Sequence, residues 1–187
     1  SKATNYYQKA LEFDPQFYLA YFQLGVLQKK QGQSKASIES LNKVLNIKPD
    51  HDKTWFTLGS VHETDGNNDL AIEHYSKAIE INPGYSKAYG SLGKLYTEKE
   101  EFKKAEDILK TVVQIDSEYA NGFMRLGLLY IEQENYKEAA KNLKISTDLD
   151  DKDYNKYFNL ASAYNQLEKW DEAAKAAQSC IDLKKKF

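Results

Sequence analysis

Apolar side chains recur at helical spacing along almost the whole chain, in paired stripes that a short polar segment separates. One stripe contains Tyr89, Leu92 and Leu95, and a second begins at Phe102 after the polar segment 97–101. Apolar residues three and four positions apart lie on one face of a helix. The pattern therefore predicts pairs of amphipathic helices, each of about 14 residues and about 21 Å long at 1.5 Å per residue.

The stripes repeat with a fixed period of 34 residues, which is the spacing between Pro15 and Pro49 (49 − 15). Proline and glycine follow this period: Pro15, Pro49 and Pro83, and Gly25, Gly59, Gly93 and Gly127, with Ala161 next in step. Leucine precedes each of these small residues: Leu24, Leu58, Leu92, Leu126 and Leu160. An aromatic residue lies four positions before each: Tyr21, Trp55, Tyr89, Phe123 and Tyr157. A small residue lies twelve positions after each: Ser37, Ala71, Ala105, Ala139 and Ala173. A period of this length predicts a solenoid of stacked repeats.

The sequence resembles the tetratricopeptide repeat (TPR) family, whose 34-residue pattern is W-x2-L-G-x2-Y, then A-x3-F, then P. The resemblance implies an all-α fold, an α-α superhelix that is a right-handed solenoid of helix hairpins. It covers essentially the whole chain as a single array. Residues 1–17 form the second helix of a partial repeat, and five repeats follow at 18–51, 52–85, 86–119, 120–153 and 154–187. The terminal proline is replaced by Ser117 and Asp151 in later repeats, and Ala161 replaces the last glycine.

Small residues are expected where the two helices of a repeat meet. Gly93 and Ala105 occupy such positions, and a larger side chain there would overpack the contact at a cost of about 1–3 kcal/mol. Gly90 and Gly122 are the two glycines that neither the repeat nor a turn explains. Two short helices do not bury both of their faces, so each hairpin needs its neighbours.

Composition and charge exclude several classes of function. The 187 residues carry a formal charge of −2 and a mean hydropathy of −0.72, without a basic block or an apolar run of the length that spans a bilayer. The sequence therefore predicts no nucleic-acid binding and no membrane insertion. The single cysteine, Cys180, excludes an internal disulfide and a multi-cysteine zinc site. The absence of an Asn-x-Ser/Thr acceptor favours an intracellular setting.

No pattern typical of an active site or a cofactor site occurs. A calcium loop beginning at Asp65 would need glycine and glutamate where Leu70 and Ser76 stand. His62 lacks the second histidine of a zinc-protease motif and occupies an aromatic slot of its repeat, so it is expected to be packed. Cys180 is expected to be a small buried thiol. The sequence predicts a non-enzymatic protein without a cofactor or a bound metal.

The resemblance also implies a binding face. In TPR proteins that bind peptides, the positions six, three and two before the small residue, and one after it, point into the concave groove. The candidate partner-binding residues selected from these positions are Phe22, Lys53, Phe56, Lys87, Ser91, Lys94, Asn121, Arg125, Leu128, Phe158 and Asn159. This set is apolar near the N-terminus, basic in the middle and amide-rich near the C-terminus. The expected ligand is a protein segment or peptide with an acidic centre and apolar anchors.

Other interpretations of these residues remain open. Phe22, Phe56 and Phe158 are equally consistent with packing, and the basic side chains with a solvated face. The carboxylate-binding clamp of chaperone-binding members is absent, because Phe22 and Val26 stand where that clamp has lysine and asparagine. The asparagine ladder of O-linked sugar transferases is absent too, since only Asn159 matches it.

Two alternative functions follow from the ends of the array. The last repeat, which ends with Lys184, Lys185, Lys186 and Phe187, lacks a polar capping helix, so its outer face could mediate self-assembly. The same pattern is expected of a fragment cut from a longer array, and that interpretation is preferred to a functional dimer. In the third interpretation, the array recruits substrate for a catalytic domain elsewhere in a larger enzyme.

Overall fold

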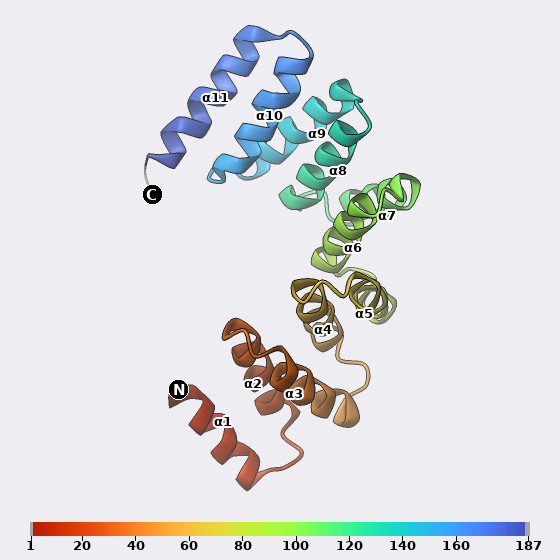
Figure 1. Ribbon diagram of the computed structural model, residues 1–187, viewed down its shortest axis with the longest axis vertical. Coiled ribbons are helices and arrows are strands. Elements are labelled where there is room, and N and C mark those ends of the chain that lie inside the picture. The colour runs from red at the N-terminus through yellow and green to blue at the C-terminus, as the bar shows by residue number, and fades with distance from the viewer. Residues whose placement is uncertain (1, 186–187) are drawn as a thin grey trace. The chain divides into compact units, whose positions relative to one another are not determined.

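A computed structural model describes residues 2–185, and these residues contain eleven α-helices (Figure 1). The helices are α1 (Lys2–Phe13), α2 (Tyr18–Lys30), α3 (Ser34–Ile47), α4 (Asp52–Thr64), α5 (Asn68–Ile81), α6 (Ser86–Glu98), α7 (Phe102–Ile115), α8 (Ala120–Glu132), α9 (Tyr136–Leu149), α10 (Tyr154–Gln166) and α11 (Trp170–Lys184). Most are 13 or 14 residues long, as the stripes predicted. The all-α prediction is confirmed. The predicted last repeat ends in Lys186 and Phe187, which lie outside the described residues.

Successive helices pack as hairpins. The most extensive contacts join α2 to α3, α4 to α5, α8 to α9, and α10 to α11. The chain divides into two compact units, residues 2–88 and residues 89–185, and the division lies inside α6. Unit 1 denotes residues 2–88 below, and unit 2 denotes residues 89–185. The single array and its repeat boundaries stay a prediction.

The glycines of the repeat lie where the two helices of a hairpin touch. A Cβ atom on Gly93 would be 2.5 Å from the Leu109 side chain, and one on Gly127 would be 2.6 Å from that of Leu143. A Cβ atom on Gly25 would lie 2.8 Å from the Leu41 side chain, and one on Gly59 would lie 2.7 Å from that of Tyr75. Real side chains essentially never come this close, so the large partner on the second helix occupies the volume that the glycine leaves free. The expected close contact at Gly93 is confirmed.

The turn inside each hairpin contains one residue in the left-handed conformation. After α2, the amide of Gly32 donates to the carbonyl of Lys29 (3.0 Å), and that of Gln33 donates to the carbonyl of Gln28 (2.9 Å). These are the two bonds of a Schellman motif, which ends a helix through a residue with positive φ. The motif recurs after α4, α6, α8 and α10. The left-handed residues are Gly32, Gly66, Glu100, Glu134 and Glu168, with φ of 71, 77, 60, 57 and 57°.

The buried core of each unit consists of the apolar stripes that the sequence predicted. In unit 1 it includes Leu41, Leu58 and Val61. In unit 2 a larger cluster runs through α7 to α11 and contains Leu109 and Leu143, both without exposed surface.

One charged side chain interrupts the apolar core of unit 2. Lys156 is 1% exposed, and its ammonium group donates to the Asp150 carboxylate. This hydrogen bond is the main cause that lowers the pKa of Asp150. A buried charge is tolerated when a partner of opposite sign bonds to it. Nothing in the repeat pattern predicted a buried lysine at this position.

Candidate functional site

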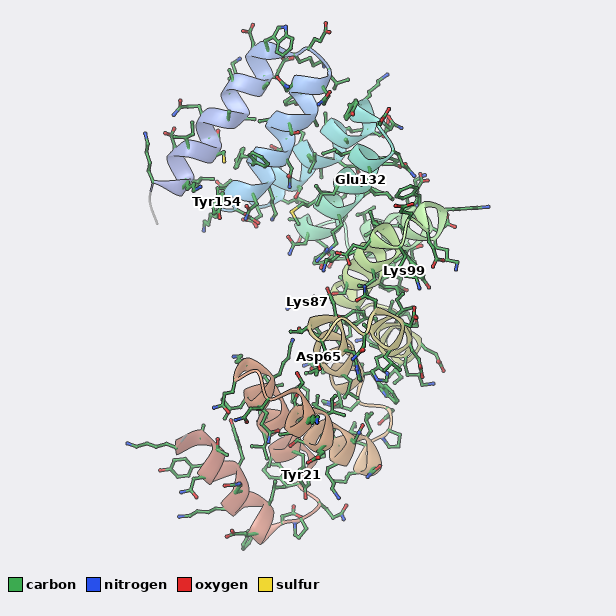
Figure 2. The ribbon with its side chains drawn as sticks, viewed as in Figure 1. Tyr21, Asp65, Lys87, Lys99, Glu132 and Tyr154 are labelled. Carbon is green, nitrogen blue, oxygen red and sulfur yellow. The ribbon has the colours of Figure 1, made fainter. Side chains whose placement is uncertain are left out.

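The eleven candidate residues lie on the first helix of a pair. Phe22 is on α2, and Lys53 and Phe56 are on α4. Lys87, which Figure 2 labels, lies in the first turn of α6. The other seven are on α6, α8 and α10: Ser91, Lys94, Asn121, Arg125, Leu128, Phe158 and Asn159. Because the chain divides inside α6, unit 1 contains the first four and unit 2 the last seven.

In unit 1 the two candidate phenylalanines pack against other rings. Phe22 lies edge-on to His51, with ring centroids 5.0 Å apart. Phe56 lies between Tyr75 and Tyr85, at 5.3 and 5.0 Å. Both phenylalanines are half-buried, so the packing interpretation describes their contacts. Two names are used below. The groove position lies three residues before the glycine that touches the second helix of its hairpin, as Phe22 lies before Gly25 and Phe56 before Gly59. The cover residue lies 29 positions after the groove position (51 − 22, 85 − 56).

Burial and nearby polar groups shift the pKa values of both cover residues. His51 Nδ1 lies 2.7 Å from the Thr54 hydroxyl, and burial is the main cause that lowers the pKa of His51. Burial, together with the nearby Asp52 carboxylate, raises the pKa of Tyr85 to about 12. The phenol of Tyr85 therefore stays neutral. By contrast, Lys53 and Lys87 are exposed.

In unit 2 three candidate residues line one pocket. Lys94 from α6 and Arg125 and Leu128 from α8 surround a cavity of about 260 Å³, together with Thr97, Glu98 and Glu132. Lys94 pairs with Glu98 at 3.2 Å. Figure 2 marks Glu132 at the end of α8. The pocket thus combines two cationic side chains, an apolar wall and two carboxylates.

Arg125 has a buried donor without an acceptor. Its Nε atom is buried and makes no hydrogen bond with any residue that the structure describes. Its guanidinium and Tyr119, the cover residue of Gly90, both lie against Gly90. Burial raises the pKa of Tyr119, and the positive charge of Arg125 opposes that rise. A buried donor that lacks a partner costs about 1–3 kcal/mol. An acceptor that enters this pocket would remove that penalty.

Gly90 provides the space for this arrangement. It occupies the groove position of its repeat, where unit 1 has Phe22 and Phe56. A Cβ atom on Gly90 would lie 2.8 Å from the Tyr119 hydroxyl and 3.5 Å from Arg125 Nε. Gly122 accommodates the same tyrosine, with its Cβ position 2.9 Å from the Tyr119 ring. The two glycines that the repeat left unexplained therefore both make room for Tyr119.

Sequence reasoning missed part of this pocket. It did not select Thr97, Glu98, Glu132 or Tyr119. The first two lie three and four residues after Lys94, so helical spacing alone places them on the face of Lys94. Tyr119 lies 29 residues after Gly90 (119 − 90), the same offset that joins Phe56 to Tyr85. That recurring offset was a usable signal.

The remaining candidates are not in this pocket. Phe158 is 64% exposed and lines a separate groove on α10 and α11. Asn121 is exposed, whereas Ser91 and Asn159 are half-buried. The residue 29 positions after Phe158 is Phe187, outside the described residues. Cys180 is half-buried rather than buried, because it borders the open groove next to Phe158.

Within residues 2–185, no three histidine, cysteine, aspartate or glutamate side chains come close enough to hold a metal ion. His62 and His74 pack with ring centroids 5.2 Å apart, and His74 also meets Trp55 at 5.5 Å. The packed position expected for His62 is what the structure has. Across the described part of the chain, no helix has the length and apolarity needed to cross a membrane.

Comparison with known proteins identifies the fold. Three family models described as "Tetratricopeptide repeat" match the chain. One matches residues 64–124, a second matches residues 6–39, and a third matches residues 23–86 and again residues 124–184. Comparison with curated proteins gives no significant match.

Solved structures agree with the family match. A crystal structure of MamA is 23% identical, with a TM-score of 0.75 over 87% of this chain and 95% of that one. PilF of Pseudomonas aeruginosa is 21% identical, with a TM-score of 0.82 over 89% of this chain and 76% of that one. YrrB, described as a TPR protein with an unusual peptide-binding site, is 17% identical, with a TM-score of 0.70 over 95% of this chain and 91% of that one.

At these identities the solved structures show a shared fold, and the family models identify the family. One model alone covers residues 23–86 and 124–184, more than half of the chain. The chain therefore belongs to the tetratricopeptide repeat family, an all-helical scaffold family whose members mediate protein–protein interactions and are typically non-catalytic.

Proposed function

We propose that the protein is a non-catalytic scaffold that binds an acidic peptide segment of a partner protein through its first helices. The pocket around Arg125, on α6 and α8, receives a carboxylate of that segment. Leu128 contacts an apolar side chain beside it, and Lys94 adds a second positive charge.

The single observation that carries this proposal is the buried Nε of Arg125, which has no acceptor among the described residues. Guanidinium groups bind carboxylates through two parallel hydrogen bonds, so Arg125 is suited to an aspartate or glutamate side chain. The cavity of about 260 Å³ gives room for one side chain and not for a folded domain.

The mixed charge of the pocket adds selectivity. Glu98 and Glu132 also line it, and Glu98 already neutralises part of the charge of Lys94. A strongly acidic surface would be repelled by these two carboxylates, whereas a single acidic side chain flanked by apolar ones avoids them. This favours a segment in which acidic and apolar residues alternate. The structural likeness to YrrB, a TPR protein with a peptide-binding site, is consistent with a peptide ligand.

The test is a titration with a fluorescein-labelled peptide, acetyl-Ala-Leu-Asp-Leu-Glu-Leu-Ala-amide, followed by fluorescence anisotropy. We expect Arg125→Gln to weaken binding about tenfold or more, because a hydrogen bond to a charged group contributes about 1.5–3 kcal/mol. Higher salt should weaken binding of the unchanged protein, since part of the attraction is electrostatic.

Two controls define the result. Lys103→Gln removes one positive charge from an exposed position on α7 outside the pocket, and it should leave the affinity unchanged. A peptide with Asn and Gln in place of Asp and Glu should bind as weakly to the original protein as the acidic peptide binds to Arg125→Gln. Equal affinity of the original protein and Arg125→Gln for the acidic peptide would refute the proposal. Capture from a cell lysate with the original protein and with the triple variant Lys87→Glu, Lys94→Glu and Arg125→Glu then identifies the partner.

A further inference from the structure

The junction between the last two hairpins contains a pocket that is separate from the sites described so far. It lies between α9, α10 and α11, where α10 packs against both of the other helices, and its volume is about 250 Å³. We call it the junction pocket. It shares no residue with the pocket around Arg125 or with the open groove next to Phe158. Its lining includes Lys144 and Asp148 from α9, Tyr164 from α10, and Ala176 and Ser179 from α11.

The preceding junction, formed by α7, α8 and α9, shows what the equivalent positions do elsewhere in the chain. There the Tyr130 hydroxyl donates to Glu106 Oε1 at 2.9 Å, and Lys110 Nζ lies 2.7 Å from the same oxygen. The bond from Lys110 is the main cause that lowers the pKa of Glu106, and the bond from Tyr130 acts in the same direction. A tyrosine and a lysine at these two positions therefore bind a carboxylate.

One period later, the two donors are present and the acid is absent. Tyr164 and Lys144 stand at the positions of the tyrosine and the lysine, whereas Ala140 stands at the position of Glu106. Both donors line the junction pocket. The Tyr164 hydroxyl makes no hydrogen bond with any residue that the structure describes. The junction thus keeps a carboxylate-binding pair of side chains without a carboxylate from the chain in the position of Glu106.

Two smaller side chains on α11 provide room for a ligand. Ala176 and Ser179 occupy the positions that Asn142 and Ile145 occupy on α9. Asn142 is buried and Ile145 is half-buried, so the larger side chains fill space in the preceding junction. With alanine and serine the pocket is wider on the side of α11. Helices of two successive hairpins enclose it.

Lys144 has a partner that a ligand can replace. Its ammonium group donates to the Asp148 carboxylate, one turn further along α9. Both side chains are more than half exposed, and exposed ion pairs contribute little to stability. In the preceding junction Gln114 stands at the position of Asp148, and Lys110 bonds to Glu106 instead. The lysine thus bonds to the carboxylate that its junction offers.

We propose that the junction pocket binds a glutamate side chain of a partner protein and that Tyr164 and Lys144 hold its carboxylate. The ligand thereby takes the place that Glu106 has in the preceding junction. Asp148 and Glu172 also line the pocket, and they repel a second negative charge. A single glutamate in an uncharged segment is therefore favoured over a free dicarboxylate. The inference does not depend on the proposed function, because the two pockets share no residue.

The probe is the peptide acetyl-Ala-Glu-Ala-amide, added to the isotope-labelled chain and followed by two-dimensional NMR. We expect saturable shifts of amide signals in α10 and α11, with a Kd of about 1–10 mM, because one side chain supplies most of the contacts. Tyr164→Phe keeps the ring and removes the hydroxyl, so it should weaken binding about fivefold. Asp148→Asn frees Lys144 and removes a repelling charge, so it should strengthen binding about threefold.

Matched controls separate this pocket from other surfaces. Tyr130→Phe removes the equivalent hydroxyl from the preceding junction, where Glu106 already occupies the site, and Arg125→Gln changes the other pocket. Both variants should bind the probe like the original protein. The uncharged peptide acetyl-Ala-Gln-Ala-amide should not bind. Ala140→Glu supplies the missing acid from the chain itself, so it should abolish binding of the probe.

Four results would overturn the inference. They are the absence of saturable shifts, an affinity that neither Tyr164→Phe nor Asp148→Asn changes, loss of binding in Arg125→Gln, and tighter binding of butyrate than of the peptide. The third result would place the probe in the pocket around Arg125. The fourth would assign the junction pocket to a free small acid, since butyrate has one carboxylate on a short chain.

Discussion

The first hairpin of unit 2 differs from those of unit 1 at the groove position, although all of them follow the same repeat. In unit 1, Phe22 and Phe56 fill it and are covered by His51 and Tyr85. In unit 2, Met124 and Phe158 hold this position on α8 and α10. On α6, Gly90 leaves it without a side chain, and the hydroxyl of Tyr119 and the guanidinium of Arg125 come close instead. A single change from phenylalanine to glycine thus replaces an apolar ring stack with a polar pocket, while the hairpin around it keeps its form.

The units also differ in their turns and in their titratable groups. The left-handed residue is glycine in both hairpin turns of unit 1 and glutamate in all three of unit 2. The three histidines of the chain, His51, His62 and His74, all lie in unit 1. By contrast, the glycine contacts between paired helices are alike in the two units. The two units therefore share the packing of paired helices and differ in the residues of their turns and in their titratable side chains.

The largest effect is expected from Gly93→Leu, which breaks the shared contact in unit 2. The new Cβ alone would be 2.5 Å from the fully buried Leu109 side chain, so the paired helices must separate. Overpacking should destabilise the protein by about 3 kcal/mol. The urea midpoint should fall, and hydrogen exchange should show the loss of protection in α6 and α7 rather than in α2 and α3.

Gly84→Leu is the matched control for this change. Gly84 is exposed, and a Cβ there meets no atom closer than 3.5 Å. Its midpoint should stay close to that of the original protein. If Gly93→Leu unfolded at the original midpoint, the contact glycine would have no role in packing.

A smaller effect of opposite sign is expected from giving unit 2 the turns of unit 1. Glu100→Gly, Glu134→Gly and Glu168→Gly each relieve a left-handed conformation that is strained for a residue with a Cβ. Each should stabilise the protein by about 1 kcal/mol, reduced by the flexibility that glycine adds to the unfolded chain. Thermal unfolding measures the change.

The reverse substitutions provide the comparison in unit 1. Gly32→Ala and Gly66→Ala should lower the melting temperature, although no atom lies within 4 Å of either new Cβ. Because there is no clash, the loss would come from backbone conformation alone. Equal melting temperatures in both series would show that the turns tolerate any residue.

Acid should affect unit 1 selectively, and this is the smallest of the three effects. Burial first, and then the neighbouring His62, lowers the pKa of His74, whereas Glu73 acts in the opposite direction. The folded state therefore binds fewer protons than the unfolded state just below pH 6.5, the usual pKa of histidine. The stability that neutral His74 provides is complete above that pH and is lost as the pH falls toward the lowered pKa.

Hydrogen exchange at about pH 7.5 and about pH 5.5, corrected for intrinsic rates, tests this prediction. Protection in α4 and α5 should fall more than in α8 and α9, and His74→Gln should reduce the difference. Equal loss in both units would contradict it.

The helix pairs were predictable from sequence, because their pattern repeats every 34 residues and can be recognised without knowing which distant residues touch. Gly93 and its equivalents could be assigned to close contacts, since only a small residue fits at a position that recurs between two stripes. The pocket around Arg125 was only partly predictable. Its lining includes acidic residues that charge alone assigns to a solvated surface. Its shape depends on Gly90, which departs from the repeat, and on Tyr119, which recurs at the position of Tyr85 but meets a glycine instead of a phenylalanine. The open groove on α10 and α11 was not predictable as a volume. Two of the residues that line it, Ala161 and Ala177, stand where the preceding hairpin has Gly127 and Leu143.

Each unit contains one tryptophan, and the different surroundings of the two indole rings make their fluorescence useful. The indole of Trp55 in unit 1 is half-buried and donates to the carbonyl of Pro49 at 2.8 Å, whereas Trp170 in unit 2 is 61% exposed in the open groove on α10 and α11. Emission from Trp170 reports the polarity around the ring, so covering the groove shifts its fluorescence to shorter wavelength. With Trp55 replaced by phenylalanine, the remaining signal belongs to the groove alone, and its occupancy is readable in solution without a label.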